Sequence, residues 1–142
     1  MVFPSEGWLR AFVAAVNLHP DLAEALRGLG GDLAAVVEAD PPDIPEPLAA
    51  YGRHQDGRIS AVRLLQDADE VWELAPAYVV RAPYRVWKSL LRGGDPVRAA
   101  LSGQVRVTGE LQALVRKANY RYVVDTALRA IETEFLDEGG PR

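Results

Sequence analysis

The spacing of apolar residues predicts that the chain begins with two helices. Within residues 4–18, Trp8, Phe12 and Val16 recur at helical steps, which places them on one face of a helix that a Pro-Ser pair begins. Residues 19–31 start with His-Pro-Asp and end in two glycines, and these features indicate a shorter second helix and its stop.

The next segment carries the signals of β-strands and tight turns. Residues 32–40 are rich in small and β-branched side chains, as strands are, and the proline-rich residues 41–47 follow as a loop. Within residues 48–66, two strand-like arms flank Asp56 and Gly57, an Asp-Gly pair that two-residue hairpin turns favour. We therefore expect a strand, a loop and a hairpin.

The strand pattern continues through residues 67–83, with an interruption near Pro76. This segment predicts a fourth strand or two strand pieces, so that a mostly antiparallel meander follows the two helices. Its acidic residues 67–70 could gather a hard cation, but four polar residues between strands are more often a solvated turn.

Helical spacing returns at Tyr84 and lasts until a glycine pair at 93–94. A short helix over residues 95–101 comes next, because Asp95 is a good N-cap and Pro96 suits the first helical position.

A last strand and a long helix complete the chain. Val105 and Val107 point to one face of a strand within residues 102–109, and their polar neighbours point to the other. From Glu110 to Phe135 the apolar residues again follow helical steps, with a break near Asn119.

Composition indicates one ordinary globular domain. The chain has 142 residues, of which 49% are hydrophobic and 25% charged, so we expect a single domain over residues 1–142. Its apolar runs are far shorter than the roughly 20 residues that cross a bilayer, it contains no cysteine, and its C-terminal Gly-Gly-Pro-Arg is not a peroxisomal address. We expect a cytoplasmic protein without a membrane-spanning segment, a disulfide or thiolate chemistry.

Charge is distributed unevenly along the chain. Residues 1–72 hold five basic and twelve acidic side chains, whereas residues 73–142 hold eleven and eight. The basic excess is greatest over residues 81–121, where Asp95 and Glu110 are the only acids. This pattern favours a small anionic group as partner, and not nucleic acid, since nucleic-acid binders are usually basic overall.

Few residues suggest catalysis. The two histidines, His19 and His54, fit surface or capping roles, and their spacing does not suggest a metal site. None of the four serines lies in a nucleophile-elbow pattern. We expect no catalytic residue, no metal and no cofactor.

Two patterns in the second half allow a binding site. Arg85, Lys88 and Arg92, with Arg81 just upstream, form a basic helix face that could hold a phosphate or carboxylate, although a solvated helix face explains the pattern as well. A series of aromatic and aliphatic residues from Tyr84 onward could line a ligand cavity, although such a series is usually core.

Residues 84–114 resemble the sterol carrier protein 2 family of small lipid-binding domains. Three consecutive pieces carry the resemblance: the helix YRVWKSLLRGG, the turn DPVRAAL and the strand-to-helix segment SGQVRVTGELQAL. The residues at the matching positions of the last piece are Gly103, Val105, Val107, Gly109, Leu111 and Leu114.

The resemblance implies an α+β fold, in which helices pack over one face of a five-stranded, mainly antiparallel sheet. It also implies an apolar cavity between the sheet and the C-terminal helices, which takes a fatty acid, fatty acyl-CoA or related lipid. Gly103 and Gly109 would let the last strand enter and leave beside closely packed helices. The residues expected to contact lipid are Tyr84, Trp87, Leu90, Leu91, Leu101, Val105, Val107, Leu111, Leu114, Val115 and Tyr122. Those expected near its head group are Arg85, Lys88 and Arg92.

Two alternatives stay open beside a non-catalytic lipid carrier. The chain could be an interaction or dimerisation module that keeps the fold with a filled cavity. It could also be an enzyme that acts on a lipid-like substrate through residues such as Glu73 and Tyr78, which ranks last because no constellation is visible. Ligand identity, a homodimer and transient membrane contact are not decided by the sequence.

Overall fold

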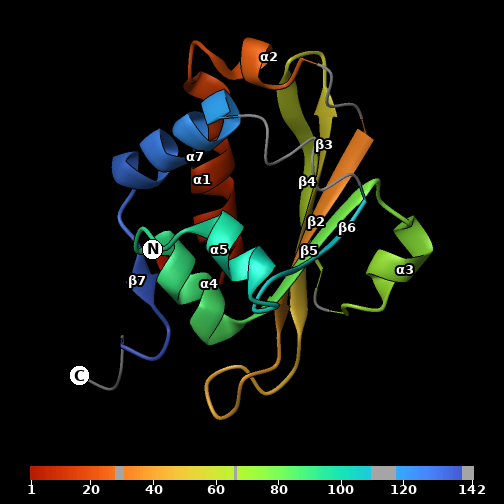
Figure 1. The fold of residues 1–142 in the computed structure, drawn as a ribbon, viewed down its shortest axis with the longest axis vertical. Coiled ribbons are helices and arrows are strands. Elements are labelled where there is room, and N and C mark those ends of the chain that lie inside the picture. The colour runs from red at the N-terminus through yellow and green to blue at the C-terminus, as the bar shows by residue number, and fades with distance from the viewer. Residues whose placement is uncertain (28–30, 66, 110–117, 139–142) are drawn as a thin grey trace.

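The fold is a five-stranded sheet with helices on both faces, together with a small two-stranded sheet (Figure 1). The computed structural model describes residues 1–27, 31–65, 67–109 and 118–138. The helices are α1 (Glu6–Leu18), α2 (Leu22–Ala25), α3 (Glu70–Leu74), α4 (Tyr84–Leu91), α5 (Pro96–Leu101) and α7 (Ala118–Ala130). The strands are β1 (Val2–Phe3), β2 (Gly31–Glu38), β3 (Leu48–Gln55), β4 (Arg58–Leu65), β5 (Tyr78–Pro83), β6 (Arg106–Thr108) and β7 (Glu134–Phe135).

Helix α1 forms as the apolar spacing predicts. The Ser5 hydroxyl accepts a hydrogen bond from the Trp8 amide at 3.1 Å and thereby caps the first turn. Trp8, Leu9 and Val16 are buried along one face, which confirms the predicted helix. The predicted second helix is confirmed as the short α2, where the His19 ring accepts a hydrogen bond from the Asp21 amide at 3.1 Å.

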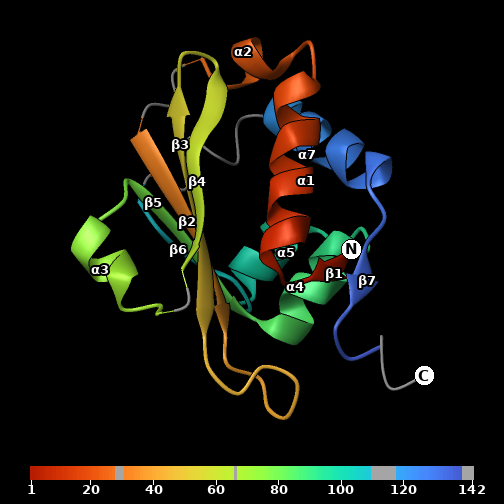
Figure 2. The ribbon, with the colours of Figure 1, turned by 180° about the vertical axis from the view of Figure 1, so that it is seen from behind.

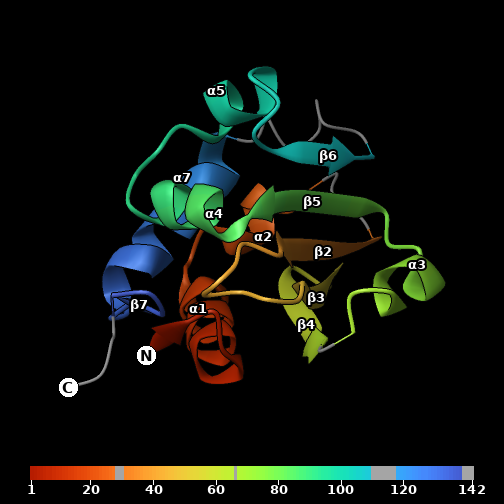
Figure 3. The ribbon, with the colours of Figure 1, turned by 90° about the horizontal axis from the view of Figure 1, so that it is seen from below.

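The large sheet has the strand order β4-β3-β2-β5-β6, and Figure 3 shows the strands in this sequence. The Asp-Gly hairpin between β3 and β4 is confirmed, and three of the four strand pairs are antiparallel. The predicted meander is wrong at β5. This strand does not pair with β4, which precedes it in the sequence, but crosses over and pairs in parallel with β2. The predicted mainly antiparallel, five-stranded sheet is confirmed.

Helix α3 replaces the first of the two strand pieces predicted around Pro76. The Asp67 carboxylate accepts a hydrogen bond from the Asp69 amide at 2.9 Å, which starts a helical turn, and Ala75 ends the helix in a left-handed conformation with φ 45°. Helix α3 lies on the face of the sheet opposite to α1, α4, α5 and α7 (Figures 1 and 3), and its Val71 packs in a cluster with residues of β2 to β5. Helices therefore cover both faces of the sheet.

The connection from β5 to β6 contains α4 and α5, and α4 packs against β5 and β2. Asp95 caps α5 by accepting a hydrogen bond from the Val97 amide at 2.9 Å, as predicted. Gly109 ends β6 with φ +104°, and a Cβ there would collide with the Ala77 carbonyl oxygen. Gly103 also has a positive φ, but no heavy atom lies within 4 Å of the place of its Cβ, so only its conformation requires glycine.

The C-terminal helix ends earlier than predicted. Helix α7 stops at Ala130, and Phe135, which was assigned to the helix, lies in β7 and pairs in parallel with Phe3 of β1. Figure 2 shows α7 beside α1, with β1 and β7 together below them. Residues 110–117, the predicted start of this helix, lie outside the described residues. No helix of the described part is long and apolar enough to cross a membrane.

Candidate functional site

One row of apolar side chains crosses the whole sheet on the side of α1, α4, α5 and α7. Leu64 of β4 pairs with Ala50 of β3, Ala50 with Ala35 of β2, Ala35 with Val80 of β5, and Val80 with Val107 of β6. We call these five residues the apolar row. Strand pairing alone sets them in line, because directly opposite residues point to the same face of a sheet.

All five residues of the apolar row remain partly exposed. Three of their neighbours on the other face, on the central strands β2 and β3, are buried: Ala34 and Ala49 are 0% exposed and Val36 is 6% exposed. The helix-side face is not accessible throughout, since Val37, Tyr78 and Ala82 are buried on it, so the partial exposure belongs to the row itself. An apolar strip that stays partly accessible inside a helical cover is the main candidate for a binding surface.

The centre of the apolar row is lined by small side chains. Leu64 and Ala50 pack in a cluster with residues of α1, α4 and α7, whereas Val80 and Val107 pack in another with α4 and α5. Within the described part of the chain, Ala35 is packed against neither cluster. Side-chain contacts are therefore concentrated at the two ends of the row.

Trp87 connects the two ends of the apolar row. Its ring packs in both clusters, and its indole N–H donates a hydrogen bond to the Val36 carbonyl at 2.9 Å, which anchors α4 to the sheet. At the β6 end the wall is continued by Val86 and Leu90. At the β4 end the half-buried residues are Phe12, Val13, Leu128 and Ile131.

Several residues predicted to contact lipid lie at the apolar row or next to it. Trp87, Leu90 and Val107 are half-buried there, and Val105 is buried in the same cluster. Leu91 packs at the other end of α4, in the cluster of the N-terminal aromatic residues. Their contact with a ligand stays a prediction.

Tyr84 has a structural position. It is 2% exposed, its ring lies 6.2 Å from that of Phe3, and its hydroxyl donates a hydrogen bond to the Asp137 carboxylate at 2.8 Å. Burial, reinforced by this hydrogen bond, raises the pKa of Tyr84 to about 12. Tyr84 thus joins α4 to the C-terminal segment.

Two predicted lining residues are exposed instead. Leu101, at the end of α5, is 83% exposed, and Tyr122, on α7, is 54% exposed with its ring edge against His19. The family resemblance implies lipid contact for both, but the six-residue α5 and the second turn of α7 leave these positions on the surface. Leu111, Leu114 and Val115 lie outside the described residues.

The basic residues predicted near a head group are already paired within the chain. Lys88 forms an ion pair with Asp137 at 2.8 Å and another with Glu138, which also pairs with Arg92. Arg85 lies 3.6 Å from Asp40. Helical geometry places these cations opposite to Val86 and Leu90, so they face away from the apolar row.

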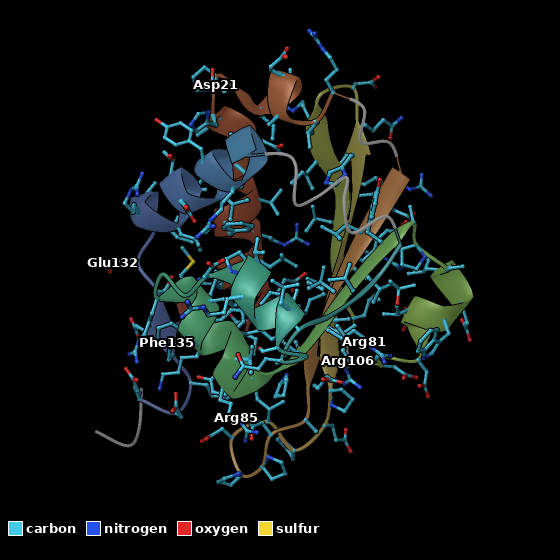
Figure 4. The ribbon with its side chains drawn as sticks, viewed as in Figure 1. Asp21, Arg81, Arg85, Arg106, Glu132 and Phe135 are labelled. Carbon is cyan, nitrogen blue, oxygen red and sulfur yellow. The ribbon has the colours of Figure 1, made fainter. Side chains whose placement is uncertain are left out.

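Arg81 does not extend this basic face. Its guanidinium lies 5.4 Å from the centre of the Trp72 ring, on the α3 side of the sheet. Figure 4 shows it beside Arg106, its partner on β6, and well away from Phe135. Alternation along β5 therefore separates Arg81 from α4.

A depression of about 270 Å³ lies at the other end of the molecule, between α2 and the hairpin. The residues that line it are Ala23, Leu26, Arg27, His54, Gln55, Asp56 and Gly57. The surface role predicted for His54 is wrong, because this side chain is 8% exposed, and burial lowers its pKa. The capping role predicted for His19 is confirmed.

The residues suggested for catalysis are not brought together. Glu73 is exposed on α3, whereas Tyr78 is buried on the helix side of the sheet. Burial opposes ionisation of Asp32, but hydrogen bonds from the Ala77 amide and the Tyr51 hydroxyl outweigh it and lower the Asp32 pKa. Among the residues that the structure describes, no group of histidines and carboxylates could hold a metal ion.

Sequence reasoning missed most of the apolar row. Alternation along each strand indicates which residues share a face, and this signal could have found Leu64 and Val80. Ala35 and Ala50 carry no chemical signal, and the pairing that aligns them follows only from the strand order.

Comparison with known proteins shows a likeness of structure. No family model and no curated protein matches the chain. The crystal structure of sterol carrier protein 2 matches with a TM-score of 0.74 and 21% identity, over 90% of this chain and 98% of that one. A conserved hypothetical protein of Thermus thermophilus, described there as a candidate sterol carrier protein, matches with a TM-score of 0.73 and 21% identity, over 92% and 90%.

A further similar structure is the UbiJ-SCP2 ubiquinone synthesis protein, with a TM-score of 0.53 and 19% identity over 89% of this chain and 95% of that one. All three cover nearly the whole chain, helices and sheet together. The chain therefore has the fold of sterol carrier protein 2.

Proposed function

We propose that the protein binds the apolar chain of a lipid along the apolar row and carries it without chemical change. The observation that carries this proposal is the partial exposure of all five aliphatic residues beneath the helices. Replacing the water on such a strip by an apolar guest lowers the free energy of the system. The fold shared with sterol carrier protein 2 supports the same conclusion.

The length of the row suits a single alkyl chain. Four gaps between neighbouring strands, at about 4.8 Å each, extend over roughly 19 Å, the length of an extended chain of about 15 carbons. At about 0.8 kcal/mol per buried methylene, such a chain gains on the order of 10 kcal/mol before ordering costs are subtracted. The proposed ligands are accordingly a fatty acid, a fatty acyl-CoA or a related lipid.

The chemistry of the row supports binding without catalysis. Its five side chains are aliphatic, so none can donate or accept a proton. The carboxylates whose pKa is lowered lie elsewhere, Asp32 on the α3 side and Asp137 and Glu138 beside α4. We place this non-catalytic protein in the cytoplasm.

The test is native mass spectrometry of the purified protein, followed by titration with a fluorescent fatty acid and competition by a fatty acyl-CoA and by ubiquinone. We expect co-purified lipid or saturable binding. A protein without either would contradict the proposal and favour an interaction module with a filled interior.

Ala35→Leu is the variant that addresses the row itself. A leucine at the central position would occupy the place of the guest, so we expect at least tenfold weaker binding, which corresponds to about 1.4 kcal/mol. Ala14→Leu is the matched control, because Ala14 is exposed on α1. Equal binding by the two variants would exclude the apolar row as the site.

A further inference from the structure

Residues 134–138, which follow α7, form an acidic strap across α4. Its first two residues pair in parallel with β1, and the Leu136 amide donates a hydrogen bond to the Phe3 carbonyl at 3.2 Å. Beyond this pairing the chain turns and carries Asp137 and Glu138 over the basic side of α4. Figure 4 shows Phe135 beside α4, on the side away from the large sheet.

The strap neutralises two cations of α4 at several points. Lys88 contacts both carboxylates, and its side chain is only 17% exposed. Arg92 pairs with Glu138. The centre of the Phe135 ring lies 5.6 Å from the Lys88 ammonium and 4.7 Å from the Arg92 guanidinium, within the range of cation–π attraction. These cations thus have an internal anion as their ligand.

Without the strap carboxylates, α4 would present Lys88 and Arg92 in line with Arg85, whose guanidinium lies 3.6 Å from Asp40. Arg85, Lys88 and Arg92 extend over about 10 Å of helix surface, given a rise of about 1.5 Å per residue. The first turn of α4 contains no acid of its own. Such a line of cations suits several anionic head groups side by side better than one small anion.

We propose that the basic face of α4 is a docking surface for anionic phospholipid membranes, and that the acidic strap masks it. The strap carboxylates occupy the cations as phosphate oxygens would, so release of Asp137 and Glu138 uncovers the surface. Docking at α4 would serve the exchange of a lipid ligand with a membrane. The proposal does not depend on the proposed function, because vesicle binding is measured without ligand.

The test compares cosedimentation of variants with phosphatidylcholine vesicles, with and without phosphatidylglycerol. Asp137→Asn/Glu138→Gln removes both strap charges, and we expect it to bind anionic vesicles on the order of tenfold more tightly than the native chain, since each freed cation adds to the attraction. Neutral vesicles should show no gain. Adding Lys88→Gln/Arg92→Gln to this variant should remove the gain.

The matched control is Asp69→Asn/Glu73→Gln, which changes net charge equally at two exposed positions, the N-cap of α3 and α3 itself, on the other face of the sheet. An equal gain in this control would overturn the proposal, since net charge alone would then explain it. A gain that survives Lys88→Gln/Arg92→Gln, or preferential capture of an acidic protein, would overturn it as well.

Glu138→Gln alone leaves the hydrogen bond between Tyr84 and Asp137 in place. This single variant therefore tests the docking proposal if Asp137→Asn/Glu138→Gln does not fold. We expect a gain of several-fold for this single variant, and unchanged vesicle binding would overturn the proposal.

Discussion

The apolar row on one face of the sheet is more accessible than the small residues of β2 and β3 on the other face. The face under α3 is closed by a helix of five residues, and Ala34, Val36 and Ala49 are buried there. The face under α1, α4, α5 and α7 has more helices above it, yet the apolar row stays partly exposed. The four helices therefore leave this row accessible, although they bury Val37, Tyr78 and Ala82 on the same face.

The difference follows from where the side chains reach. On the α3 side, Val71 and Leu74 sit directly on the small residues of β2 and β3. On the other side, the large residues pack at the two ends of the apolar row, and alanines occupy its middle. A close-packed interior needs interdigitating side chains, and within the described ranges of the chain Ala35, at the middle of the row, is part of no such cluster.

Adjacent leucines on β4 give the strongest test of this comparison. Leu65 is 3% exposed in the α3-side cluster, so Leu65→Ala should lower the free energy of unfolding by about 2–5 kcal/mol. Leu64 belongs to the apolar row and is partly exposed, so Leu64→Ala should cost no more than about half as much. Urea denaturation of both variants measures the difference, and equal losses would remove the contrast between the faces.

Two glycines at the ends of β6 sharpen the comparison at the sheet edge. Gly109→Ala combines a positive φ with a collision against the Ala77 carbonyl, so we expect a loss of about 3 kcal/mol in the free energy of unfolding. Gly103→Ala meets the conformational strain alone and should cost about 1 kcal/mol. Thermal unfolding of the two variants checks the ranking, and a larger loss at Gly103 would show that the edge is not packed as described.

Local patterns in the sequence predicted most elements of the fold. Trp8, Phe12 and Val16 locate α1 because helical spacing alone decides which side chains face inward. The Asp56-Gly57 turn locates the hairpin because few residues adopt its backbone, and both have positive φ in the structure. Long or chemically strict patterns are predictable without knowledge of tertiary contacts.

The elements that were missed depend on distant contacts. Helix α3 is too short to show a period, and its acidic first turn reads equally well as a solvated turn. β7 forms because Phe135 meets Phe3 at the other end of the chain. The strand order, which places β5 beside β2, likewise has no local signal.

The same reasoning explains which parts of the candidate site were predictable. Trp87 and Leu90 could be identified from the helical pattern and the family resemblance. The central alanines of the apolar row could not, because their alignment requires the pairing of all five strands. Nor could the pairing of Lys88 with Asp137, since the sequence shows the cation without its distant partner.

Neighbouring alanines of β2 test the two faces with an added side chain. Ala34 is 0% exposed under α3, so Ala34→Leu should overpack that face and cost about 1–3 kcal/mol in the free energy of unfolding. Ala35→Leu should change it by less than about 1 kcal/mol, because the new methyl groups enter the least packed part of the apolar row. Chemical denaturation compares the two, and an equal loss would mean that the row is filled.

His54 gives a smaller, pH-dependent test at the hairpin end of the molecule. Burial lowers the pKa of the His54 ring in the folded protein below its usual 6.5, so the fold favours the neutral ring. As the pH falls below 6.5, His54 is protonated in the unfolded chain before it is protonated in the folded one. The contribution of His54 to the free energy of unfolding is therefore complete above pH 6.5 and declines as the pH falls from 6.5 towards the lowered pKa. His54→Gln cannot titrate at this position, so its free energy of unfolding should fall less steeply over the same range. Urea denaturation over this pH range measures the free energy of unfolding of both proteins. Parallel profiles would contradict the prediction, because they would show that His54 takes up a proton as easily in the folded protein as in the unfolded chain.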